Sequence, residues 1–178
     1  MAASGTTIDD RFDHAVLATL RYAGLRNDEL VNLRTANVDL EGATIHVVGK
    51  GRKARTIPIP ARLVTILDHY LTEMRPELAA SPFLFASPRS MAGGSHVGRV
   101  SNRSVHAAVH RQGVAAGVPG NHHLHRWRHA YATGLLRAGV SLEHIRRLLG
   151  HASITTTSRY LHLDLDDLTV AVNHTFDE

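Results

Sequence analysis

The sequence of 178 residues contains no cysteine, which excludes a disulfide-stapled scaffold, a cysteine-based zinc site and a thiol nucleophile. No apolar run approaches the roughly 20 residues that a membrane-spanning helix needs. The chain opens on small and polar residues, so we expect no signal peptide. With 43% hydrophobic and 20% charged residues, the composition is typical of one globular domain, and we expect it in the cytoplasm.

Lysine is nearly absent as well, since 18 of the 20 basic residues are arginine. The two lysines, Lys50 and Lys53, both fall in the glycine-containing segment 49–53. Codon composition alone can produce such a bias. The alternative interpretation is that a surviving lysine marks a place that needs an ammonium group, which can give up its proton where a guanidinium in effect cannot.

The charge is distributed unevenly along the chain. Residues 162–178 hold five acidic side chains and no lysine or arginine, which leaves a net charge of +9 on residues 1–161. A basic body with an acidic tail indicates a polyanionic partner, and nucleic acid ranks ahead of a membrane because no basic amphipathic helix is present. The alternative is a solvated surface with a chance bias.

Hydrophobic periodicity predicts a mixed α+β domain that is mostly helical. Alternating β-branched residues predict strands over 43–48 and 55–60, which form a small antiparallel hairpin near residues 36–60. Prolines in the second strand place it at a sheet edge. Gly24 and Gly150 are expected just past helix ends. Helices are expected over 9–23, from Asn27, and over 61–74, 101–116, 123–138, 142–149, 154–161 and 165–174.

A cluster of histidines and arginines fills residues 122–129. His125 and His129 are four residues apart, a spacing that zinc could bridge on one helix face. However, the His-Glu-x-x-His pattern is absent, and two neighbouring arginines would repel a dication. The cluster fits an anion site better, because His125 and Arg128 share a helix face and can converge on one phosphate.

Four motifs, taken in order, resemble those of the tyrosine recombinases, also called the phage integrase family. Gly24-Leu25-Arg26-x-x-Glu29-Leu30 resembles their first arginine motif, and Gly49-Lys50-Gly51-x-Lys53-x-Arg55 resembles their catalytic-lysine hairpin. His125-x-x-Arg128-His129 is similar to their second box. Leu149-Gly150-His151, followed nine residues later by Tyr160, is similar to the third. The resemblance runs from about residue 13 to residue 163.

The resemblance implies a role for each matching residue. Tyr160 would attack a DNA phosphate, forming a 3′-phosphotyrosyl bond and releasing a 5′-hydroxyl. Arg26 and Arg128 would clamp the non-bridging oxygens, and His151 would donate a hydrogen bond to one of them. Lys50 would protonate the leaving oxygen, and His125 would assist proton transfer at the tyrosine. The residues expected to contact DNA are Arg52, Lys53, Arg55 and Arg103.

These six side chains can together supply the chemistry of strand cleavage. A phenol has a pKa near 10, so it needs a base or a strong cationic field to attack at neutral pH. Guanidinium forks meet the charge that gathers on the equatorial oxygens of the pentavalent state. With two arginines, a lysine and a histidine, the reaction needs no metal, and it needs no nucleotide or other cofactor because the phosphotyrosine conserves the bond energy.

The resemblance also bears on domain organisation. We expect residues 1–178 to form a single C-terminal-type catalytic domain, because too few residues precede Arg26 for the N-terminal DNA-binding domain that the family usually carries. Its full-length parent would act as a homotetramer on duplex DNA, in the cytoplasm and associated with the nucleoid. The acidic segment 164–178 is expected to be a helix that either folds onto its own domain or docks on a neighbouring protomer.

Two other functions remain open. A type IB topoisomerase shares the nucleophile and the arginine clamp, and a non-catalytic DNA-binding regulator could derive from the same fold. The third box and the small size favour the recombinase over the topoisomerase, and the complete set of six catalytic positions argues against the regulator.

Overall fold

The computed structural model describes residues 8–49, 53–75, 81–86, 98–118 and 123–151. The chain divides into two compact units, Met1–Tyr131 and Ala132–Glu178, and the boundary falls within helix α5 (Leu124–Arg137). The architecture is mostly helical with one small antiparallel sheet, which confirms the predicted fold class. Within the described ranges, no helix is long and apolar enough to cross a membrane.

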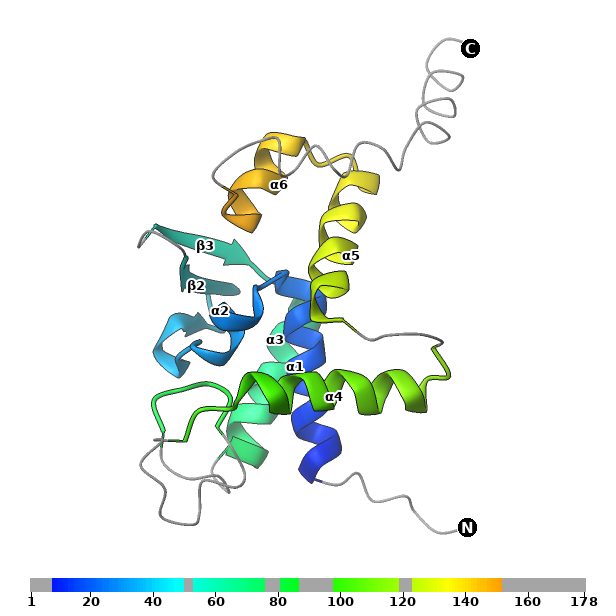
Figure 1. Ribbon diagram of the computed structural model, residues 1–178. Helices are drawn as coiled ribbons and strands as arrows, with labels where there is room; N and C mark the ends of the chain where they lie inside the picture. Colours follow the sequence, from blue (N-terminus) through cyan, green and yellow to red (C-terminus); the bar gives the residue numbers. More distant parts are fainter. Residues whose placement is uncertain (1–7, 50–52, 76–80, 87–97, 119–122, 152–178) are drawn as a thin grey trace. The chain divides into compact units, whose positions relative to one another are not determined.

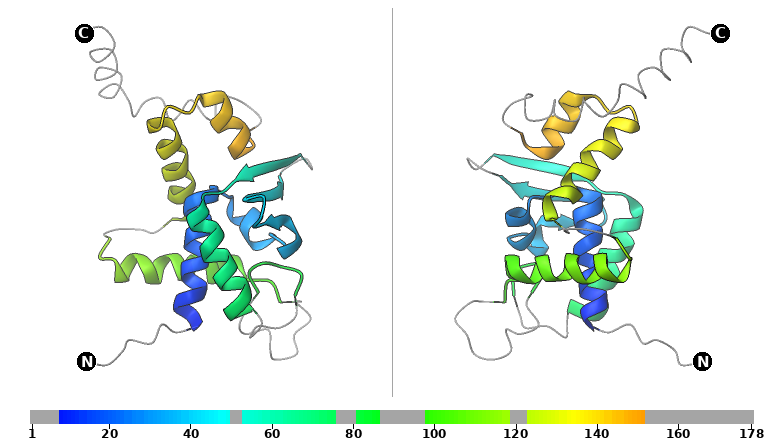
Figure 2. Two further views of the ribbon diagram at one scale, coloured as in Figure 1. Left: turned by 180° about the vertical axis from the view of Figure 1, so that it is seen from behind. Right: turned by 45° about the vertical axis from the view of Figure 1, so that its right-hand side comes forward.

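Three helices form the body of the first unit: α1 (Ile8–Ala23), α3 (Ala61–His69) and α4 (Asn102–Ala115). Helices α1 and α3 run side by side and α4 crosses α1, as Figures 1 and 2 show. A π-helical turn, η3 (Tyr70–Met74), extends α3 to the predicted end of that helix. Phe12 of α1 meets the edge of Phe85 with 6.1 Å between ring centres, and aliphatic side chains from all three helices are buried around this pair.

One buried ion pair ties α1 to α4. The Asp13 side chain is only 1% exposed and accepts two hydrogen bonds from Arg111, at 2.9 Å from Nε and 2.6 Å from Nη2. A buried carboxylate needs such partners, because its desolvation is otherwise very costly. The position of α4 on α1 is therefore set by charge as well as by packing.

The sheet contains β1 (Val38–Asp39), β2 (Thr44–Val48) and β3 (Ala54–Pro58), in the order β1-β2-β3. Ile45 pairs with Ile57 and Val47 with Arg55, and this face of the sheet points into the core. Strand β3 is an edge strand, as its prolines predict. The two-residue strand β1 and the 3₁₀ turn η1 (Thr35–Asn37) were not predicted, because elements this short show no periodicity.

The remaining helices match their sequence signals. Helix α2 (Asn27–Val31) follows the turn at Gly24, and α5 coincides with the predicted helix 123–138 to within one residue at each end. In the second unit, Ser141 caps α6 (Leu142–Leu149) and Gly150 ends it in a left-handed conformation with φ of +61°. The predicted helices 154–161 and 165–174 lie outside the described residues.

Candidate active site

The turn at Gly24 joins α1 to the candidate site. Its φ is +57°, a conformation that residues with a Cβ rarely adopt. A Cβ atom at this position would also lie 2.3 Å from Cδ1 of Tyr131, so the tyrosine ring occupies the space that a side chain would need. The Gly24 carbonyl oxygen accepts a 2.7 Å hydrogen bond from Arg128 Nη1. Glycine is thus required here for conformation and for packing, and its backbone carbonyl holds an arginine.

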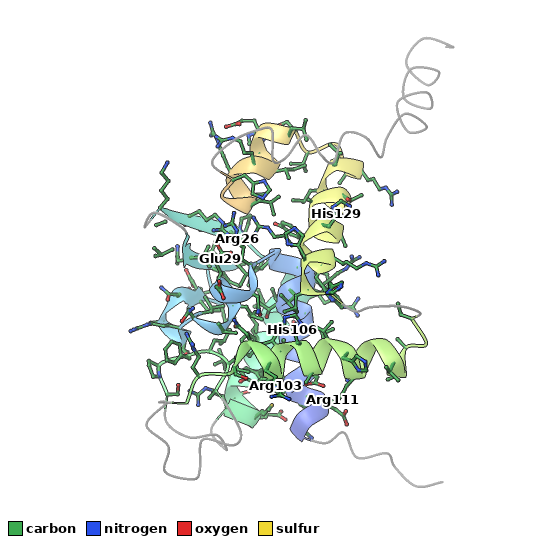
Figure 3. All side chains as sticks on the ribbon, viewed as in Figure 1. Arg26, Glu29, Arg103, His106, Arg111 and His129 are labelled. Atoms are coloured by element: carbon green, nitrogen blue, oxygen red, sulfur yellow. The ribbon has the colours of Figure 1, made fainter. Side chains whose placement is uncertain are left out.

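Glu29 is the centre of a cluster of three arginines, which come from the N-cap of α2, from β3 and from α5. Arg55 donates to both carboxylate oxygens at 2.8 Å, in the bidentate geometry that suits a guanidinium. Arg26 donates from its backbone N–H at 2.8 Å and from Nη1 at 3.0 Å. Nη1 of Arg128 lies 3.9 Å from Oε2. Figure 3 labels Arg26 and Glu29, which lie next to each other beside the sheet.

The charges in this cluster differ in how far they are covered. The side chains of Glu29 and Arg128 are 6% and 3% exposed, whereas that of Arg26 is 38% exposed. Burial pushes the pKa of Glu29 upward, but hydrogen bonds and charges from Arg55 and Arg26 outweigh it and lower the pKa from 4.5 to about 2. Burial also raises the pKa of Tyr131, against the opposing charges of Arg55 and Arg128. The cluster therefore carries an ionised Glu29 and an excess of positive charge at neutral pH.

A cleft of about 700 Å³ opens beside this cluster. Its walls come from α2, the segment leading to β1, and strand β2 through Gly49. Arg26 and Glu29 line it together with polar side chains that include Asn32, Arg34 and His46. A cleft of this size with a partly exposed guanidinium in its wall can admit a phosphodiester and place it against Arg26.

The structure brings together two of the six predicted catalytic residues, Arg26 and Arg128, through Glu29 and Gly24. His125 is exposed on α5, one turn before Arg128. His151 is half-buried in the second unit, where its backbone N–H and C=O both hydrogen-bond to Arg146. Lys50, Arg52 and Tyr160 lie outside the described residues.

The four predicted DNA contacts fall into different surroundings. Lys53 and Arg103 are exposed, and Figure 3 shows Arg103 near the start of α4. Arg55 is only 10% exposed and is engaged by Glu29, although sequence reasoning placed it on the DNA-facing hairpin. The strand alternation could have shown this, since Arg55 shares a face with the buried Ile57. Across the described ranges, no group of three histidines or carboxylates is arranged to hold a metal ion.

Glu29 belongs to the first arginine motif, but the sequence alone assigns it no role. Its position three residues after Arg26 is the spacing of a capping box, and its side chain does accept from the Arg26 backbone N–H at the start of α2. That signal predicts the local hydrogen bond. It carries no information about the two more distant arginines.

The model of the phage integrase family matches residues 1–166 of this sequence, which includes every element that builds the arginine cluster. The chain belongs to the phage integrase family. Among curated relatives, this phage integrase domain is 39% identical over 157 residues to the tyrosine recombinase XerC of Serratia marcescens, with 88% of the chain and 49% of the relative covered. It is 37% identical over 157 residues to XerC of Haemophilus ducreyi, with the same coverage. The chain thus spans about half the length of the curated relatives it matches.

Solved structures of the family share the fold. The crystal structure of XerA recombinase superposes with a TM-score of 0.78 at 29% identity and covers 94% of this chain and 57% of that one. XerH site-specific recombinase, bound to a palindromic difH substrate in a post-cleavage complex, superposes with a TM-score of 0.78 at 23% identity, covering 97% of this chain and 48% of that one. These likenesses confirm the tyrosine recombinase catalytic fold that the four motifs implied.

Proposed function

We propose that this phage integrase domain cleaves and rejoins duplex DNA in site-specific recombination, through a 3′-phosphotyrosyl intermediate. The observation that carries the proposal is the pair of arginines, Arg26 and Arg128, brought together by Glu29 and the Gly24 carbonyl next to a cleft that Arg26 lines, in a chain that belongs to this family. The two guanidinium groups come from positions 102 residues apart, and each is held by a specific acceptor. Such pre-arranged cations match the charge that develops on a phosphate under attack.

The remaining steps are distributed over the other four residues. Tyr160 attacks the phosphorus atom, and the 5′ oxygen of the next nucleotide leaves. Lys50 protonates that oxygen, since an ammonium group can release its proton there. His125 takes part in removing the phenolic proton, and His151 donates to a non-bridging oxygen. Each of these assignments rests on the position of the residue in a family motif.

Contacts to the DNA backbone come from exposed cations outside the arginine cluster. Lys53 in the turn between β2 and β3 and Arg103 on α4 are both exposed, which suits phosphate contacts. Arg52 is included on the basis of its place in the hairpin motif. Replacing either described residue with methionine should reduce the dependence of log Kd on log salt concentration by about one unit, because each phosphate contact releases roughly one counterion.

Covalent trapping on a nicked suicide substrate tests the proposed function. After strand cleavage, the short fragment beyond the nick diffuses away and the protein stays attached to DNA. The chain should form this adduct, Tyr160→Phe should form none while still binding DNA, and Tyr22→Phe should behave like the unaltered chain, since Tyr22 is a half-buried residue of α1 outside the site. An adduct from Tyr160→Phe at undiminished yield refutes the assignment of the nucleophile.

The same preparation separates the alternatives. A recombinase exchanges strands between two DNA sites. A type IB topoisomerase instead relaxes a supercoiled plasmid without exchanging strands, and a regulator derived from the fold binds DNA but forms no adduct. The full-length parent is proposed to act as a homotetramer on DNA, in the cytoplasm and associated with the nucleoid.

The acidic segment 164–178 is proposed to join protomers within that assembly. It holds five acids, no lysine or arginine, and apolar side chains at intervals that suit packing against a partner. Its acids disfavour contact with DNA and favour a basic protein surface. Deleting the segment should leave the melting temperature of the isolated chain unchanged and weaken assembly of the parent on DNA. A large drop in the melting temperature shows instead that it packs on its own domain.

A further inference from the structure

Arg55 occupies a position in the sheet that does not suit a DNA contact. It lies on the face of β3 that also carries the buried Ile57, and its cross-strand partner Val47 is buried as well. Its neighbours Ala54 and Thr56 lie on the exposed face. Both terminal nitrogens of its guanidinium donate to Glu29, so the fork that would hold a phosphate bidentately is already engaged by a carboxylate.

We propose that Arg55 is a positioning residue, which neutralises Glu29 and so leaves Arg26 and Arg128 with a net positive charge toward the DNA phosphate. This inference rests on the proposed function, because it presumes that the two arginines bind that phosphate.

The hydrogen bonds around Glu29 support these separate roles of Arg55 and of the two phosphate-binding arginines. Each carboxylate oxygen accepts one bond from Arg55 and one from Arg26, all between 2.8 and 3.0 Å. Arg128 stays further away at 3.9 Å and gives a 2.7 Å bond to the Gly24 carbonyl. A carboxylate can accept about four hydrogen bonds. With Arg55 in place, the lone pairs of Glu29 are therefore occupied and do not draw Arg128 closer.

Charge balance leads to the same conclusion. Glu29 is ionised, since its pKa is about 2 in these surroundings. Three arginines and one carboxylate leave two positive charges in the cluster. Without Arg55 only one remains, and the vacated lone pairs attract the arginines that should bind substrate. A substrate phosphate then competes for them with Glu29, whose side chain is only 6% exposed and therefore interacts strongly with nearby charges.

A double-mutant cycle between Arg55 and Glu29 tests the proposal. Arg55→Met should slow covalent cleavage at saturating DNA by about 10- to 100-fold, a range usual for coupling between residues in one ion-pair network. In a Glu29→Gln background the same change should matter by less than about 3-fold, because no negative charge remains to be neutralised. Arg55→Lys keeps the charge without the fork and should recover part of the rate. Arg62→Met, which removes an exposed cation from α3, is the matched control.

Two further readouts distinguish positioning from other roles. Arg55→Met should leave the salt dependence of DNA binding unchanged, whereas Lys53→Met should reduce it by about one unit. Equal rate losses in both backgrounds, or a reduced salt dependence in Arg55→Met, overturn the proposal in favour of a direct DNA contact. Should Arg55→Met fail to fold in a circular dichroism melt, Arg55→Lys carries the same comparison.

Orthovanadate, a mimic of the phosphate under attack, separates this inference from the proposed function. Its binding, measured by isothermal titration calorimetry, should weaken in Arg55→Met and not in the Arg55→Met, Glu29→Gln double variant. If the unaltered chain binds vanadate but forms no DNA adduct, the proposed function fails while the role of Arg55 is still tested. If the unaltered chain does not bind vanadate, the arginine pair is no phosphate site and the inference is overturned.

Discussion

Replacing Gly24 with alanine should lower the free energy of unfolding by about 2–5 kcal/mol, because two separate costs meet at this position. The left-handed φ of +57° costs a residue with a side chain roughly 1–2 kcal/mol. The added methyl group would lie 2.3 Å from Cδ1 of Tyr131, well inside contact distance, and overpacking of this kind costs about 1–3 kcal/mol. For a chain of this size the sum corresponds to a melting temperature lower by about 10 °C.

Urea unfolding followed by circular dichroism measures this change, and the chain supplies a matched control. Gly117 has a similar φ of +64°, but no atom lies within 4 Å of the position a Cβ would take. Gly117→Ala should therefore show only the conformational cost of about 1–2 kcal/mol. In a Tyr131→Ala background, Gly24→Ala should also fall to that smaller cost, because the obstructing ring is gone.

The same substitution should reduce DNA cleavage, since the Gly24 carbonyl that moves away from Tyr131 is the acceptor for Arg128. Equal destabilisation by Gly24→Ala and Gly117→Ala would refute the reasoning, because it would mean that the Tyr131 ring yields at no cost. So would a Gly24→Ala penalty that persists in full when Tyr131 is alanine.

Three other predictions concern charge. Asp13→Ala should lower the free energy of unfolding by about 2–3 kcal/mol, because it removes a buried partner of Arg111. Glu73→Ala, which breaks an exposed ion pair, should lower it by less than about 0.5 kcal/mol. Similar losses from the two substitutions would contradict the role of burial. The stability that ionised Glu29 contributes is fully present above its ordinary pKa of 4.5 and is lost as the pH falls toward about 2. The difference in unfolding free energy between Glu29→Gln and the unaltered chain should therefore shrink over that pH range. A difference that stays constant contradicts this assignment. Lys50→Ala should slow cleavage by roughly 100-fold, and a substrate with a 5′-bridging sulfur, which is a better leaving group, should restore the rate. An equal deficit on both substrates would mean that Lys50 binds a phosphate and does not act as the general acid.

Local sequence signals determined the secondary structure of the described ranges closely. Apolar residues at helical spacing, Ser141 before α6 and the glycines after α1 and α6 act within a few residues of themselves, so they need no tertiary contact to be recognised. The hairpin and its edge strand follow from β-branched alternation and proline for the same reason. The four motifs determined the family, since their order and spacing are properties of the chain itself.

Only the tertiary structure decided which groups meet. Glu29 and Arg55 are 26 residues apart and Gly24 and Arg128 are 104 apart, and no periodicity reports on partners at such distances. Arg55 belonged to the hairpin motif by sequence, yet the side of the sheet that packs on the core turned it toward Glu29. Likewise, Gly24 was recognisable as a helix stop, but the ring of Tyr131 against it depends on how α5 packs on the turn. The physical reason is the same in each case: backbone preference acts locally, whereas a buried charge takes its partner from whichever distant segment the fold brings within hydrogen-bonding distance.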